Sequence, residues 1–243
     1  MRPLSTPELV RAWEGGLAHA PADRALLLLA HACPEESWEE LARLPIGRRD
    51  ARLLTLREWT MGSELDCVAY CPSCAAPVEL HFSVADVRDD TAAPPGGELN
   101  VEVGAYTVVF RLPDSTDLSV VDGCTDDASA RRALLRSCLS SARHRGRKRS
   151  VSRLPAKVLD AVVRRMAEAD PQADMHTTLT CPACTHSWRA TFDIVSFFLA
   201  ELESWMYRLL HDVHRLAASY GWREADILAL SPRRRQFYLD MVG

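Results

Sequence analysis

The stretch Thr178–Trp188 reads TLTCPACTHSW, and the stretch Tyr70–Leu80 reads YCPSCAAPVEL. Each places two cysteines three positions apart across a proline, a spacing that lets both sulfurs of a tight turn converge on one metal ion. The cysteines are Cys71, Cys74, Cys181 and Cys184. Because a tetrahedral zinc site takes four such ligands, we predict that these cysteines hold one structural Zn²⁺ per chain.

The residues around each cysteine pair indicate β-strands. The first pair lies between residues 65–70 and 78–84, and the second lies between residues 176–180 and 188–194. All four flanks alternate in polarity or are rich in β-branched and aromatic side chains, which is typical of strands. We therefore expect each pair to lie at the tip of a β-hairpin.

More than a hundred residues, 75–180, separate the two pairs. Closing a loop of that length costs about 4 kcal/mol by the logarithmic rule for loop entropy. A structural zinc site contributes roughly 10 to 16 kcal/mol of apparent binding free energy. One ion can therefore join both pairs, and the intervening residues become an insertion with a fold of its own. Two alternatives stay open: a thioredoxin-type redox pair, which needs a βαβ context, and two unrelated buried pairs.

Composition restricts the class of protein. A chain of 243 residues with 47% hydrophobic content can bury a core without disulfides. The formal net charge of -4 indicates a soluble protein with no overall attraction for nucleic acid. We find no signal peptide and no apolar run that could span a bilayer, so we expect a cytoplasmic protein, in which thiols stay reduced and favour metal binding. The other cysteines are expected to be small buried hydrophobes, and they are Cys33, Cys67, Cys124 and Cys138.

The remaining segments predict an α+β fold, with helical N- and C-terminal parts around a four-cysteine zinc-ribbon-like hairpin core and an inserted α/β subdomain. Helical periodicity and turn signals predict helices over residues 8–13, 23–31, 37–43, 47–58, 129–139, 156–168 and 198–220, a loop over 92–97, and a hairpin from 99–103 and 106–110. We call the tight turn that holds each cysteine pair a knuckle. The expected regions are an N-terminal helical region (1–62), a first knuckle hairpin (63–86), an inserted hairpin-plus-helices subdomain (87–174), a second knuckle hairpin (175–195) and a C-terminal helical region (196–243).

The run 143–149, RHRGRKR, is the strongest basic cluster, with five Lys or Arg in seven positions. We expect a solvated loop there, because no aromatic residues are interleaved to stack on bases. A phosphate-binding arm is the alternative interpretation.

The final segment, after Leu230, is dense in apolar and aromatic side chains that follow three arginines. Such a density is typical of interface hot spots. The candidate partner-binding residues are Arg233, Arg234, Phe237, Tyr238 and Leu239. The alternative is that the same residues dock on the long helix predicted over 198–220.

The sequence contains no catalytic constellation that we recognise. A Walker loop, a dinucleotide glycine fingerprint, a G-x-S-x-G elbow and an H-E-x-x-H helix are all missing from it. A zinc ion saturated by four thiolates also has no open position for water or substrate. We therefore predict a protein that is not an enzyme and has no small-molecule substrate.

Several motifs together resemble a known family, the T4-type phage baseplate proteins known as baseplate hub assembly chaperones. They are the two knuckles and the stretches 44–57 (LPIGRRDARLLTLR), 111–118 (RLPDSTDL), 169–174 (ADPQAD), 188–193 (WRATFD) and 220–239. The resemblance runs over nearly the whole chain, and the C-terminal stretch is its most specific part. Where the family often has glycine after a knuckle, Ala75 and Thr185 follow the cysteines, which bears on the tightness of each turn.

The resemblance implies a structural or assembly protein in the baseplate or hub of a contractile phage-tail-like particle, a contractile injection system. It would act through contacts with baseplate or hub proteins and without chemistry, in the cytoplasm or incorporated in the particle. The alternative function is a zinc-ribbon regulator that binds nucleic acid through residues 143–149. Salt-sensitive retention on DNA separates the two functions, because binding to phosphates releases counterions.

Overall fold

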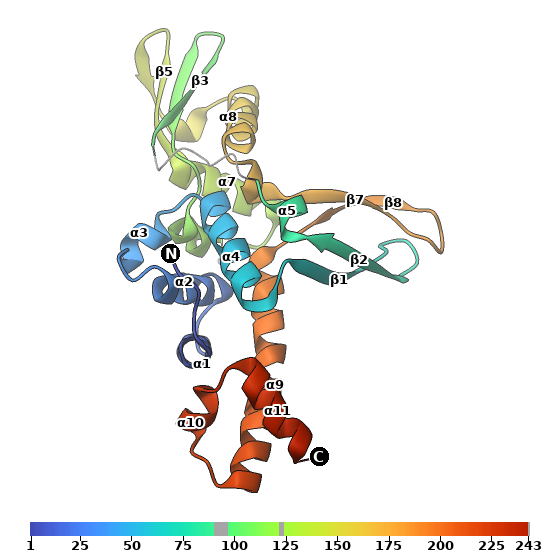
Figure 1. Ribbon diagram of the computed structural model, residues 1–243. Coiled ribbons are helices and arrows are strands. Elements are labelled where there is room, and N and C mark those ends of the chain that lie inside the picture. The colour runs from blue at the N-terminus through green and yellow to red at the C-terminus, as the bar shows by residue number, and fades with distance from the viewer. Residues whose placement is uncertain (90–96, 122–123, 243) are drawn as a thin grey trace. The chain divides into compact units, whose positions relative to one another are not determined.

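The computed structural model describes residues 1–89, 97–121 and 124–242 (Figure 1). The chain divides into two compact units: Met1–Glu36 together with Ile194–Gly243, and Ser37–Asp193. The mixture of helices and strands confirms the α+β prediction. The five regions expected from the sequence stay a prediction, and residues 92–96 of the expected loop lie outside the described residues.

The unit formed by the two chain ends is helical. Its helices are α1 (Thr6–Gly16), α2 (Pro21–Ala32), α9 (Ile194–Tyr220), α10 (Glu224–Leu228) and α11 (Pro232–Met241). The long helix α9 buries residues at the spacing of three and four that the sequence predicts, such as Phe198, Leu202 and Leu209. Trp205 is only half-buried, and its neighbour Met206 takes the core position instead.

The second unit, Ser37–Asp193, contains all the strands that the structure describes. Its elements are α3 (Trp38–Ala42), α4 (Ile46–Met61), β1 (Glu64–Tyr70), β2 (Pro77–Ser83), α5 (Val84–Val87), β3 (Leu99–Val103), β4 (Tyr106–Phe110), η1 (Ser115–Asp117), α6 (Leu118–Val121), α7 (Asp127–Cys138), β5 (Leu139–His144), β6 (Arg147–Arg149), η2 (Val151–Arg153), α8 (Ala156–Ala169), η3 (Pro171–Asp174), β7 (His176–Thr180) and β8 (Ser187–Thr191). Within the described ranges the strands form two hairpins, β1–β2 and β7–β8, and one four-stranded sheet in the order β3-β4-β5-β6.

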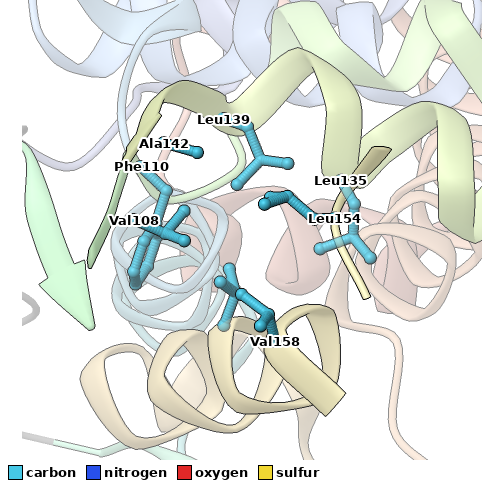
Figure 2. Close-up of a cluster of buried hydrophobic side chains, with 8 residues drawn as sticks. Val108, Phe110, Leu135, Leu139, Ala142, Leu154 and Val158 are labelled. Carbon is cyan, nitrogen blue, oxygen red and sulfur yellow. The ribbon is translucent and has the colours of Figure 1, made fainter. Parts of the chain in front are cut away.

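The four-stranded sheet has a hydrophobic core of its own (Figure 2). Val108 and Phe110 alternate along β4 and are fully buried. Val158 and Val162 on α8 belong to the same cluster, as does Leu135 of α7. Alternate side chains of the strand β4 pack against one apolar face of the helix α8. This part of the chain therefore buries a core without help from the four cysteines of the predicted metal site.

The basic run 143–149 is not a loop, so that prediction is wrong. It forms the hairpin β5–β6, in which Arg143 pairs with Lys148 and His144 pairs with Arg147. Positive φ angles at Arg145 and Gly146 close the two-residue turn. Charged side chains are tolerated here because β6 is the last strand of the sheet, where water solvates them and where they discourage pairing with other chains.

Candidate metal centre

Each cysteine pair lies at the tip of a β-hairpin, as the sequence predicts. The strands β1 and β2 pair as far as Tyr70 opposite Pro77, and the first cysteine pair occupies the connection. The strands β7 and β8 pair as far as Thr180 opposite Ser187, with the second pair in the same position. The connections therefore place all four sulfurs at hairpin ends.

Backbone hydrogen bonds shape the first knuckle. The amide of Ala75 donates to the carbonyl of Cys71 at 2.8 Å, and the amide of Cys71 donates to the carbonyl of Ala76 at 3.0 Å. Ala75 has φ 59°, in the left-handed region that favours glycine. The chain therefore turns tightly around the first cysteine.

The second knuckle repeats this pattern bond for bond. The amide of Thr185 donates to the carbonyl of Cys181 at 2.9 Å, and the amide of Cys181 donates to the carbonyl of His186 at 2.9 Å. Thr185 also has φ 59°. The two knuckles thus share one geometry although their residues after the second cysteine differ.

The four sulfur atoms come together. All of them lie within 4.8 Å of one another. The Sγ atoms of Cys71 and Cys184 are 3.6 Å apart, as are those of Cys74 and Cys181. Sulfurs bound at about 2.3 Å to a tetrahedral zinc would lie roughly 3.8 Å apart. The cluster therefore has the dimensions of a four-thiolate metal site, and both of these sulfur pairs join different hairpins.

The electrostatics of the cluster favour a bound cation. The backbone amide of Cys184, opposed by burial and assisted by the amide of Ala183, lowers the pKa of Cys181 to about 7. The amide of Ala76 also lowers the pKa of Cys74, but the surrounding sulfurs outweigh it and raise that pKa to about 12. Four thiolates this close repel one another, and a divalent cation would supply the missing positive charge.

The bases of the two hairpins meet through an aromatic pair. Phe82 at the end of β2 and Phe192 after β8 make an edge-on contact with ring centroids 5.4 Å apart. The hairpins form separate two-stranded sheets. Isolated two-stranded hairpins are marginally stable at best in water. The cysteine cluster and the phenylalanine pair both bring the two hairpins together.

The other four cysteines are divided by burial. Cys33 and Cys138 are buried, as expected for small hydrophobes. Cys67 and Cys124 are only partly buried, so the expectation is wrong for these two. Burial, reinforced by the nearby Asp117 carboxylate, raises the pKa of Cys138 to about 11. None of the four belongs to the sulfur cluster found in the described part of the chain.

Sequence reasoning missed a polar junction that joins the motif stretches 44–57, 111–118 and 169–174. At its centre the amide of Gly47, in the first turn of α4, donates to Oδ2 of Asp170 at 2.9 Å. A β-carbon at Gly47 would lie 1.9 Å from Oδ1 of Asp170. Only glycine therefore allows this approach.

The stretch 111–118 contributes an ion pair and a cap to the same junction. Both terminal nitrogens of Arg111 donate to Asp117, at 2.6 and 2.7 Å. Asp114 accepts from the amide of Thr116 at 2.9 Å and begins η1. The amide of Ile46 donates to the carbonyl of Pro113 at 3.0 Å, which joins this stretch to the start of α4.

Gln172 holds the chain after α5. Its side chain donates to the carbonyl of Val87 at 3.1 Å and accepts from the amide of Asp89 at 2.6 Å. Because Gln172 and Asp170 both lie at η3, one short segment fixes the start of α4 and the end of the first hairpin region. The signal available in the sequence was the presence of Pro and Asp in two short stretches, 111–118 and 169–174, that show neither helical nor strand periodicity.

Comparison with known protein families finds a match. The family described as T4 bacteriophage base plate protein matches residues 22–199. The chain belongs to this family. The matched range includes both knuckles and the whole polar junction. No curated protein and no solved structure matches the chain.

Membership of the baseplate family gives this protein a structural role and implies association with other baseplate proteins. None of its described helices combines the length and the apolar character needed to cross a membrane.

The candidate partner-binding residues of this baseplate protein lie on α11, beyond the matched range. Arg233, Arg234 and Phe237 are exposed, and 62% of Phe237 is accessible to solvent. Leu239 is only 4% exposed and belongs to the core. Tyr238 is half-buried and packs edge-on against Trp222, with ring centroids 4.9 Å apart. The binding of a partner by these residues stays a prediction, and burial separates them into an outer and an inner face.

Proposed function

We propose that the four clustered cysteines hold one structural zinc ion per chain. The observation that supports this most is the convergence of four sulfurs from two knuckles of the same geometry, at distances close to those of a tetrahedral thiolate site. Two hairpin tips of this kind around one ion would make a zinc-ribbon-like centre. Zinc would supply positive charge and four strong bonds to the site.

The zinc would act as a structural staple. Cys71 and Cys74 would hold it from the first hairpin, and Cys181 and Cys184 would hold it from the second. Four thiolates leave no open coordination position, so the ion would bind neither water nor substrate. Its role would be to tie together the two ends of the inserted residues 75–180 and to give the two hairpins one fixed arrangement.

The zinc assignment is tested by elemental analysis of protein purified without chelator. We expect about one zinc per chain in the wild type. Cys71→Ser and Cys184→Ser should lose the metal and several kcal/mol of stability. Cys124→Ser is the matched control, because this partly buried thiol lies outside the cluster and should keep both. Wild-type protein that is well folded and free of metal would overturn the assignment.

We further propose that the protein acts in the baseplate or hub of a contractile phage-tail-like particle, as a non-enzymatic assembly chaperone or as a component that stays in the particle. Support comes from the family match over residues 22–199 and from the exposed outer face of α11. The outer face, defined by Arg233, Arg234 and Phe237, would contact the partner protein. The protein would work in the cytoplasm, where such particles are assembled.

This role is tested by co-purification with the other baseplate proteins of the same particle and by electron microscopy of the particles. Phe237→Ala should reduce co-purification at least severalfold and leave the melting temperature nearly unchanged, because Phe237 is exposed. Leu239→Ala is the contrasting variant: it removes a buried side chain and should cost about 2 to 5 kcal/mol of stability. Normal particles assembled in the absence of the protein would contradict the proposal.

A further inference from the structure

A pocket of about 530 Å³ opens beside α9 and α11 in the helical unit. Its lining combines aromatic and charged side chains. Trp205 and Tyr207 contribute from α9, together with Arg208 and Asp212, and Arg235 contributes from α11. The pocket lies outside the metal centre and beyond the residues that match the baseplate family.

Arg235 is the unusual residue of this pocket. It is only 5% exposed, whereas its neighbours Arg233 and Arg234 are exposed. Its Nη1 atom is buried and has no hydrogen-bond partner among the described residues. A buried donor without an acceptor costs about 1 to 3 kcal/mol, and more when it is charged. Burial of this guanidinium therefore does not stabilise the folded chain by itself. A hydrogen-bond acceptor from outside the chain would satisfy the Nη1 donor.

The carboxylate that acts electrostatically on Arg235 does not fill this role. Asp212 faces Arg235 closely enough to act on its pKa, which burial lowers and the Asp212 carboxylate raises. The two side chains nevertheless form no hydrogen bond or ion pair within the described chain. Arg208 precedes Asp212 by one helical turn on α9, so a cation also lies beside this carboxylate. With two arginines and one aspartate, the lining keeps a net positive charge.

The rest of the lining suits a polypeptide ligand. Trp205 is half-buried and lines the pocket together with Arg235. Its indole ring offers a broad apolar surface. Tyr207 is 62% exposed and packs edge-on against Trp13 of α1, with ring centroids 6.3 Å apart. A carboxylate accompanied by an apolar side chain would satisfy both parts of the pocket, because arginine binds carboxylates through two parallel hydrogen bonds while aromatic rings bury the apolar neighbour.

We infer that this pocket is a binding site for a carboxylate of a partner polypeptide, with Arg235 as the anchoring residue and Trp205 as the surface for an adjacent apolar side chain. The carboxylate belongs to an Asp or Glu side chain or to a chain terminus. The identity of the partner as a baseplate protein rests on the proposed function, whereas the binding of a peptide carboxylate does not.

The test follows the guanidinium resonances of the full-length, ¹⁵N-labelled protein during titration with three acetylated tetrapeptides. The first contains leucine, tryptophan, glutamate and leucine and has an amidated end. The second has glutamine in place of glutamate. The third has alanine at that position and a free terminal carboxylate. We expect at least one carboxylate peptide to shift the Arg235 signals and to bind about tenfold more tightly than the glutamine peptide, a difference near 1.4 kcal/mol.

The two carboxylate peptides distinguish the sources. Stronger binding of the glutamate peptide assigns the site to an acidic side chain, and stronger binding of the free-acid peptide assigns it to a chain terminus. Failure of all three peptides to shift the Arg235 signals at millimolar concentration, or equal binding of the glutamine peptide, overturns the inference. Normal baseplate assembly alongside that failure would leave the proposed function intact.

Variants separate binding from structure. Arg235→Met should abolish peptide binding while the melting temperature of the free protein stays the same or rises, because an unpaired buried charge is replaced by an apolar side chain of similar length. Arg223→Met is the matched control, because Arg223 is exposed and does not line the pocket, and this variant should bind normally. A fall in melting temperature of similar size in Arg235→Met and Asp212→Asn would show that the two residues form a structural pair, and the inference would then be wrong.

Discussion

At the scale of single residues, the two knuckles hold non-glycine residues in a conformation that favours glycine. Ala75 and Thr185 both have φ 59°. The left-handed region costs a non-glycine residue roughly 1 to 2 kcal/mol, and a β-branched residue such as threonine is least suited to it. The strain persists because the amides of both residues donate to a cysteine carbonyl in this conformation. The same turn geometry is therefore kept with alanine in one knuckle and threonine in the other.

Glycine at these positions should therefore stabilise the protein. We expect Thr185→Gly to raise the free energy of unfolding by about 1 kcal/mol and Ala75→Gly to raise it by less. Ala183→Gly is the control, because Ala183 has no positive φ and glycine there should cost up to about 1 kcal/mol in unfolded-state entropy. Urea denaturation of the metal-loaded proteins measures all three. A loss of stability in Thr185→Gly as large as in Ala183→Gly would refute the argument.

Asp50 should make stability depend on pH. Burial raises the pKa of Asp50 to about 6, although Arg49 donates to its carboxylate at 2.8 Å. Because the unfolded state ionises this group near pH 4, the wild type should lose stability relative to Asp50→Asn as the pH rises from about 4 to 6. The shift of about two pKa units corresponds to a change of up to about 3 kcal/mol. Denaturation of both proteins across this range gives the difference, and a constant difference would contradict the prediction.

At the scale of elements, short polar segments position the helices and hairpins of the second unit. The start of α4 lies against η3 through the Gly47 amide and the Asp170 carboxylate. Burial raises the pKa of Asp170, while the hydrogen bond from Gly47 opposes this shift. The segment η3 also holds the chain after α5 through Gln172. These contacts join segments more than eighty residues apart, and each depends on an exact fit between backbone and side chain.

The fit between α4 and η3 predicts a large effect of one methyl group. Gly47→Ala places a β-carbon 1.9 Å from Oδ1 of Asp170 and 2.9 Å from the amide nitrogen of Ala173. We expect it to cost about 3 kcal/mol, because the contact is overpacked and a charge-assisted hydrogen bond is strained. Gly15→Ala in α1 meets nothing within 4 Å and should instead stabilise by up to about 1 kcal/mol. Thermal denaturation compares the two, and equal effects would rule out a specific fit at Gly47.

At the scale of the whole molecule, the parts should differ in their dependence on metal. The two hairpins have few buried residues of their own: β1 buries Leu65, and β7 buries Leu179. The sheet β3-β4-β5-β6 has a complete hydrophobic cluster with α7 and α8 (Figure 2). If the zinc joins the hairpin tips, its removal should affect these parts unequally, because stability is not uniform across a structure.

Chelation should therefore loosen the hairpins selectively. After treatment with a strong zinc chelator, amides of β1, β2, β7 and β8 should exchange with deuterium about tenfold faster or more, since a metal-free pair of hairpins is marginally stable. Amides of β4 and β5 are the internal control and should keep their protection. Hydrogen exchange followed by mass spectrometry measures both. If the hairpin amides of the metal-free protein exchange at the same rate as in the metal-loaded protein, the metal has no structural role.

What the sequence by itself determined was local. The spacing of the cysteines predicted the tight knuckles, and the alternation of their flanks predicted the hairpins, because both depend on residues close together in the chain. The helical stripe of α9 followed in the same way from its period. The sequence argument for one shared site had to assume that metal binding outweighs the cost of closing the long loop between the two cysteine pairs. The structure brings their sulfurs within 4.8 Å of one another.

What only the tertiary structure decided was which distant groups meet. Residues 143–149 carry no apolar alternation, yet they form strands because the neighbouring strand β4 offers a template for pairing. The approach of Asp170 to Gly47 and the burial of Arg235 without a partner have no signature in the local sequence. Side-chain charge and backbone fit at such places depend on neighbours contributed by other segments, so their energies are defined only once the chain has folded.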